Sequence, residues 1–171
     1  HGGKNWPAGA YSPLTKMLYF PLQQTCMDVT STINRADLRS LYGIRVDLKI
    51  APGETDMGTV QAFSAETGAL KWKQTQRAGA ASLVATGGGL LFGGDADGRF
   101  RAFDQKTGKV LWSVSLGAPI TGFPITYAVN GRQFVAVSTG SSLTAGALNS
   151  ITQDLHPGNF NALFVFEIKG K

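Results

Sequence analysis

The chain has 171 residues, of which 43% are hydrophobic and only 16% are charged, so its composition excludes a disordered or collagen-like protein. The formal net charge is +5, but the basic residues are dispersed and no recognition motif accompanies them, so we do not expect nucleic-acid binding. The apolar runs are well short of the roughly 18 residues that span a bilayer, and we expect no membrane span.

The first expected strands lie close to the start of the chain. Residues 10–12 and 17–20 resemble a pair of short strands, and the segment 13–16 between them begins with proline, as many turns do. The sequence therefore predicts a hairpin before residue 25.

The segment 25–57 breaks the strand pattern. It is too long for an ordinary turn, and it contains the turn-forming pair Pro52-Gly53. Within it a helix at 35–41, with Asn34 as its N-cap, is one interpretation. Connections of this length are usually functional or cover a site.

A repeated segment dominates the middle of the chain. Residues 58–72 recur at 98–112, 40 residues later, with the same Gly, Ala-Phe, Thr-Gly and Trp. Each copy predicts a strand, a turn closed by Thr-Gly, and a second strand that carries Trp72 or Trp112. A period of about 40 residues with four short strands is typical of β-propeller blades, which bury their faces only against neighbouring blades. We therefore interpret the two tryptophans as packing anchors between blades.

Between the two copies the sequence predicts one more hairpin and one tight turn. Strands are expected at 82–86 and 90–93 around a Gly-Gly turn. The Asp-Ala-Asp-Gly segment at 95–98 has the alternating carboxylates of a calcium loop but lacks the later glutamate of an EF-hand. Asp-Gly before a strand is ordinarily a hairpin turn, which is the interpretation we favour.

After the second copy, strands are expected at 125–129 and 132–138, because an Asn-Gly pair between them is a strong hairpin signal. The last strand is predicted at 163–168. The connection 139–159 is the second long insertion, and it contains glycine, serine and proline in place of a strand pattern.

We interpret residues 1–171 as one partial propeller domain of about three blades, with insertions at about 25–57 and 139–159. Propellers close with four to eight blades, and an open stack leaves two sheet faces bare. We therefore expect the chain to need further blades and not to fold alone as a closed body.

The segment Ala-Phe-Asp-x-x-Thr-Gly-Lys-x-x-Trp at 102–112 resembles the tryptophan-docking motif of quinoprotein dehydrogenases, the eight-bladed propellers that hold pyrroloquinoline quinone (PQQ). The first copy departs from that motif at Ser64, where the motif has Asp. Three further segments resemble the family in the same order: Gly-x-x-Asn-Trp ending at Trp6, Cys-Met-Asp beginning at Cys26, and the closing blade at 117–137. The resemblance covers essentially the whole chain, as the C-terminal third or less of a PQQ-dependent alcohol dehydrogenase.

The resemblance implies that Asn5 and Trp6 contact PQQ and that Leu143 or its neighbours line the same pocket. The residues alone also permit an Asn turn with a core tryptophan, and an ordinary surface loop around Leu143. The resemblance assigns no catalytic residue and no metal ligand to this chain, because Ca²⁺ or a lanthanide ion would be bound mainly by the N-terminal part.

The activity that the resemblance implies is oxidation of a small alcohol to an aldehyde or ketone by hydride transfer to PQQ. The expected location is the periplasm, and the expected partners are the remaining propeller blades and a cytochrome c or another electron acceptor. The alternative is a non-catalytic propeller scaffold that binds proteins through quinoprotein-like repeats. The Asn-Trp and Cys-Met-Asp segments favour the enzyme, because a scaffold needs only the tryptophan repeats.

Cys26 has two interpretations. As the single cysteine it cannot form an internal disulfide, and a lone cysteine is most often a small buried hydrophobe. Under the resemblance, Cys26 pairs with a cysteine that would fall before residue 1, which suits an oxidising compartment.

Overall fold

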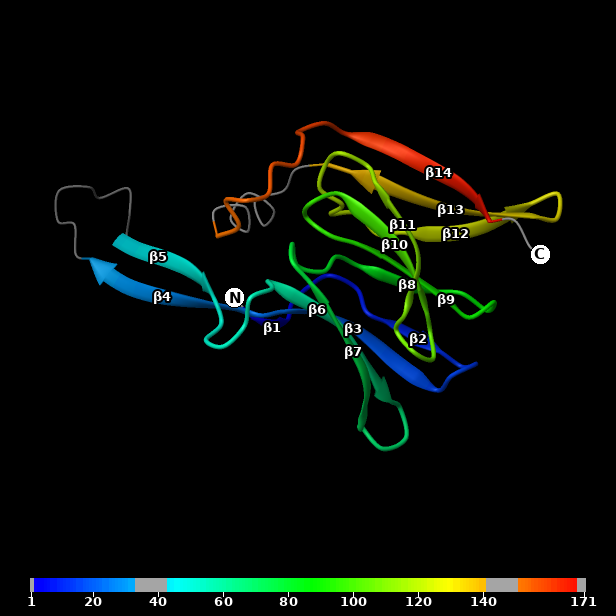
Figure 1. Cartoon of the computed structure of the whole chain (residues 1–171), viewed down its shortest axis with the longest axis horizontal. Coiled ribbons are helices and arrows are strands. Elements are labelled where there is room, and N and C mark those ends of the chain that lie inside the picture. Colours follow the sequence, from blue (N-terminus) through cyan, green and yellow to red (C-terminus); the bar gives the residue numbers. More distant parts are fainter. Residues whose placement is uncertain (1, 33–42, 141–150, 169–171) are drawn as a thin grey trace.

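The structure is a computed structural model that describes residues 2–32, 43–140 and 151–168, and these residues form an all-β fold (Figure 1). Their strands make three antiparallel sheets, which we call blades 1 to 3, and one two-stranded ribbon. The prediction of an all-β partial propeller is confirmed. No helix with the length and hydropathy of a membrane span occurs in the described part of the chain.

Blade 1 is an antiparallel meander in the order β2, β3, β6, β7. Its strands are β2 (Ala10–Ser12), β3 (Met17–Gln23), β6 (Gly58–Ser64) and β7 (Leu70–Gln76). A short strand, β1 (Gly3–Lys4), pairs with the end of β3 that β2 leaves free. Tyr19 pairs with Ala62, and Ala62 pairs with Trp72, so these three side chains lie in one row on one face of the sheet.

Blade 2 repeats this arrangement. Its strands are β8 (Leu83–Ala85), β9 (Leu90–Gly94), β10 (Arg99–Asp104) and β11 (Val110–Ser115). Phe92, Ala102 and Trp112 form the row that matches the row in blade 1. In both blades the register shifts directly after the central alanine, where β-bulges interrupt the ladder. The repeat seen in the sequence is therefore a repeat of structure.

Blade 3 consists of β12 (Ile125–Val129), β13 (Arg132–Thr139) and β14 (Ala162–Ile168). The Asn-Gly turn between the first two strands has the predicted form, since Asn130 and Gly131 have φ values of +50° and +76°. The described residues give this blade three strands, whereas blades 1 and 2 each have the four strands of a propeller blade.

The hydrophobic core lies between the blades, not within any one of them. Blades 1 and 2 share one cluster, made of Tyr19, Val60, Ala62, Trp72, Ala80, Leu83, Leu91 and Phe103. Blades 2 and 3 share another, made of Phe92, Phe100, Ala102, Leu116, Ile120, Val135 and Val137. Each sheet is thus stabilised by burying a face against its neighbour, which is the reason that blades stack.

The insertion after β3 differs from the expected loop. It forms a ribbon of two antiparallel strands, β4 (Thr25–Thr32) and β5 (Gly43–Ile50), which projects away from the blades (Figure 1). Apolar residues alternate with polar ones along both strands, a period-2 pattern that favours strands. The helix considered at 35–41, with Asn34 as its cap, lies outside the described residues.

Blade 3 leaves one apolar face open. Ile125, Tyr127 and Val129 alternate along β12, and Val165 lies in the same row as Ile125 because both pair with Ala136. These residues are 39–56% exposed, and Leu163 of the same face is 70% exposed. An apolar surface of this kind on a propeller blade is normally covered by the next blade.

Candidate functional site

Two kinds of connection meet at one end of the blades, which we call the site end. Because strand direction alternates, the segments that enter β2, β8 and β12 lie at the same end as the connections from second to third strands. Hydrogen bonds join these segments: Leu83 N–H donates to Ala8 O over 3.0 Å, and Gly140 N–H donates to Pro119 O over 2.9 Å. Both long insertions of the sequence belong to this end.

Asn5 and Trp6 lie at the site end, in the segment between β1 and β2. The Asn5 Oδ1 atom accepts a hydrogen bond of 2.8 Å from the Trp6 backbone N–H, which fixes the local turn. Lys4 Nζ donates to the carbonyl oxygens of Asn5 and Pro7 and closes the same turn from outside. Asn5 Nδ2 has no hydrogen-bond partner among the described residues, so this donor is available to a ligand.

Trp6 is not a core residue, because its side chain is 64% exposed. Its ring meets the ring of Phe123 edge-on, with centroids 6.3 Å apart and an interplanar angle of 67°. Phe123 lies just before β12 and is 53% exposed. No local sequence signal marks Phe123 as a site residue, because Trp6 lies far away along the chain.

Leu143 and Cys26 are the other expected site residues. Leu143 lies outside the described residues. Cys26 is half-buried on β4, at the base of the ribbon, and has no disulfide partner among the described residues. It pairs across the ribbon with Lys49, whose pKa is raised above its usual value by a hydrogen bond with Asp28.

Trp72 is buried between blades 1 and 2. Its Nε1–H donates to Gln105 O over 3.0 Å, and a Cβ atom on Gly108 would lie 2.6 Å from the indole ring. The indole therefore lies flush against the turn between β10 and β11.

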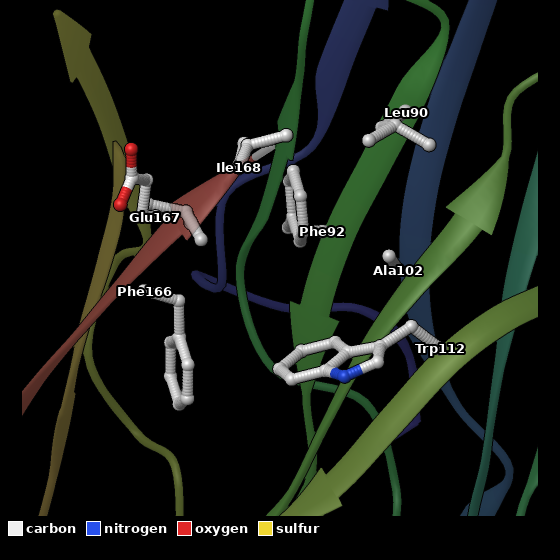
Figure 2. A pocket seen from close by; sticks show the side chains of 8 residues that line it. Leu90, Phe92, Ala102, Trp112, Phe166, Glu167 and Ile168 are labelled. Atoms are coloured by element: carbon white, nitrogen blue, oxygen red, sulfur yellow. The ribbon is translucent and has the colours of Figure 1, made fainter. Parts of the chain in front are cut away.

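Trp112 occupies the matching position but is 39% exposed. It lines a hollow of about 400 Å³ between blades 2 and 3, together with Leu90, Phe92, Ala102, Val135, Phe166, Glu167 and Ile168 (Figure 2). The lining is apolar except for Glu167, whose carboxylate is held by Arg132. This hollow is therefore mainly apolar, and the indole N–H of Trp112 is the one side-chain donor in its lining.

The Asp-Ala-Asp-Gly segment is a turn whose first carboxylate is hydrogen-bonded within the protein. Asp95 Oδ1 accepts hydrogen bonds of 3.0 Å from the N–H groups of Asp97 and Arg99, while Oδ2 accepts one of 2.6 Å from Arg101. Burial and the Asp95 carboxylate raise the pKa of Asp97. No cluster of His, Cys, Asp and Glu that could hold a metal ion is present in the described ranges.

Comparison with known proteins agrees with this architecture. Residues 73–135 match the PQQ family model, which is described as the β-propeller domain of glucose, ethanol and alcohol dehydrogenases. The solved structure of a europium-containing methanol dehydrogenase superposes with a TM-score of 0.82 at 28% identity, covering 97% of this chain and 33% of that one. The fold is therefore that of a quinoprotein β-propeller.

Curated relatives extend over nearly the whole chain. A quinoprotein alcohol dehydrogenase of Pseudomonas putida is 34% identical over 98% of this chain and 27% of its own length. A lanthanide-dependent methanol dehydrogenase of Methylacidiphilum fumariolicum is 35% identical over 91% of this chain and 26% of its own length. The chain belongs to the family of PQQ-dependent quinoprotein alcohol dehydrogenases. It spans about a quarter of the length of these relatives.

Proposed function

We propose that the polypeptide containing this chain oxidises an alcohol to an aldehyde or ketone, and that this chain supplies one wall of its PQQ site. The observation that carries the proposal is the pairing of a free amide donor, Asn5 Nδ2, with the exposed ring of Trp6 at the site end. The family relationship supports the same chemistry.

The residues present fit a flat, carboxylated quinone. Such a molecule needs hydrogen-bond donors in its plane and an apolar surface beside it, and Asn5 and Trp6 offer one of each. PQQ, when bound, supplies the acceptor for the hydride of the alcohol. Asn5 would donate from Nδ2 to a cofactor oxygen, and Trp6 would exclude water from the side of the ring. We assign no base and no metal ligand to this chain.

The remaining parts of the site would come from further blades. The exposed apolar face of blade 3 and the projecting ribbon support a larger propeller. A Ca²⁺ or lanthanide ion would be held mainly by those blades, and one relative is named as lanthanide-dependent. A cytochrome c or another carrier would take up the electrons, as the name of a lupanine hydroxylase relative indicates for that protein. A periplasmic location suits this proposal.

The activity is tested with the full-length polypeptide, prepared without cofactor and then loaded with PQQ and either Ca²⁺ or La³⁺. We expect reduction of an artificial electron-accepting dye with methanol, ethanol or 1-butanol, and no reduction without PQQ. Failure to bind PQQ and to reduce the dye with any of these alcohols, under either metal, would contradict the proposal and favour the scaffold.

Cys26 gives a test of the oxidising compartment. A Cβ atom on Gly2 would lie 2.5 Å from Thr25 O, so the first residues of the chain run directly beside the residue that precedes Cys26. A cysteine shortly before residue 1 would therefore enter the structure on the side where Cys26 lies. We expect the native full-length protein, denatured without reductant, to leave Cys26 unlabelled by an alkylating reagent in peptide mass spectrometry. Reduction before alkylation should label it, and labelling without reduction would contradict the disulfide.

A further inference from the structure

We propose that Phe123 is a positioning residue for the cofactor, because its ring holds Trp6 in the orientation in which Trp6 packs against the quinone. The inference rests on the proposed function and adds a residue to its site. Phe123 provides the one ring contact that Trp6 makes within the described residues. Without Phe123, the exposed indole of Trp6 would be free to change its rotamer. The binding of PQQ would then have to fix that rotamer, at an entropic cost.

The segment that carries Phe123 is held firmly. Ile120 is 1% exposed in the core between blades 2 and 3, and Thr121 Oγ1 donates to a carbonyl oxygen at the end of β13 over 3.1 Å. A Cβ atom on Gly122 would lie 2.2 Å from Ser138 Oγ, so the backbone there lies directly against β13. Phe123 is therefore presented by a rigid support.

The segment that carries Trp6 leads into blade 1 and is hydrogen-bonded to the start of blade 2. Ala8 N–H donates to Ser82 Oγ over 3.0 Å, while Ala8 O accepts from Leu83 N–H. Trp6 thus lies in the segment that leads into blade 1, and Phe123 lies in the segment that leads into blade 3. The two rings meet beside the segment that leads into blade 2. Each side chain remains more than half exposed, with 64% for Trp6 and 53% for Phe123. Their edge-on contact makes an apolar corner, beside Asn5, against which one flat ring can pack.

The test uses the full-length apoenzyme and measures the Kd for PQQ by titration of its absorbance. We expect Phe123→Ala to raise the Kd about three- to tenfold, the range typical of an edge-on aromatic contact, and Phe123→Tyr to stay within about twofold of the parent. Phe160→Ala is the matched control, since Phe160 is 45% exposed near the same end and has no ring contact among the described residues. The thermal midpoint of each variant is measured alongside, to separate binding from folding.

A double-variant cycle decides whether Phe123 acts through Trp6. If it does, adding Phe123→Ala to Trp6→Ala raises the Kd by less than twofold beyond Trp6→Ala alone. Full additivity, or a Kd for Phe123→Ala equal to that of Phe160→Ala, would overturn the inference while leaving the proposed function intact. A parent apoenzyme that binds no PQQ would instead contradict the proposed function itself.

Discussion

Replacing Trp72 by alanine is expected to lower the free energy of unfolding of the full-length protein by about 3–5 kcal/mol, the usual cost of removing a large buried aromatic side chain. Trp72 belongs to the cluster that joins blades 1 and 2, where Tyr19 approaches its ring with centroids 5.7 Å apart. Removing the indole would leave a cavity against the turn at Gly108, so the two blades would lose a large apolar contact.

The packing of Trp72, more than its hydrogen bond, accounts for this effect. Gln105 O accepts from Tyr19 Oη over 3.1 Å as well as from Trp72 Nε1 over 3.0 Å, so the carbonyl keeps a partner when the indole N–H is lost. We therefore expect Trp72→Phe to cost only about 1–2 kcal/mol. Denaturant unfolding followed by circular dichroism measures both variants.

Lys71→Ala is the control for this prediction, since Lys71 is the exposed neighbour of Trp72 on the same strand and should change stability by less than about 0.5 kcal/mol. An unfolding midpoint of Trp72→Ala that equals that of Lys71→Ala would show that the blades do not depend on this contact.

Asn5→Ala is expected to weaken the binding of PQQ to the full-length apoenzyme by about 10- to 100-fold. The loss combines a hydrogen bond to a charged or strongly polar cofactor oxygen with the local turn that Asn5 Oδ1 makes with Trp6 N–H. The Kd is measured by the same absorbance titration, and dye reduction at saturating PQQ shows whether the loaded enzyme still turns over.

A second substitution separates the two roles of Asn5. Asn5→Asp keeps an oxygen that accepts from Trp6 N–H but has no donor, and its negative charge repels a carboxylated ligand. We expect it to bind PQQ at least as weakly as Asn5→Ala. Asn159→Ala, at another exposed asparagine of the site end, should leave the Kd unchanged. An Asn5→Asp variant that binds PQQ like the parent would exclude donation from Nδ2.

Local sequence signals predicted the blades well. The Asn-Gly turn at 130–131 needs positive φ at both positions, and few other residue pairs adopt it. The Ala-Phe and Thr-Gly pairs, repeated at a fixed distance before each tryptophan, define the same strand, bulge and turn twice. These features depend on neighbouring residues, so a sequence without relatives is enough to locate them.

The ribbon and the Trp6–Phe123 contact depend on residues that are distant in the sequence. The apolar residues of β4 and β5 alternate along the strands, but the connection between the strands has no short hairpin signal, so the length of the segment favours a loop. The alternation was the signal that could have found them. Phe123 becomes a site residue only because blade stacking brings it to Trp6, and periodicity along the chain carries no information about that distance.

The alternation of strand direction gives the protein two unlike ends. The end opposite Asn5 and Trp6 carries short turns in the described part of the chain, including those at 13–16, 86–89 and 130–131. In Figure 1 the hairpin of β12 and β13 points to the right, whereas the ribbon points to the left. A linker attached at 130–131 would immobilise the full-length protein on an electrode with Trp6 facing the solution, and a linker in the ribbon would turn Trp6 towards the electrode.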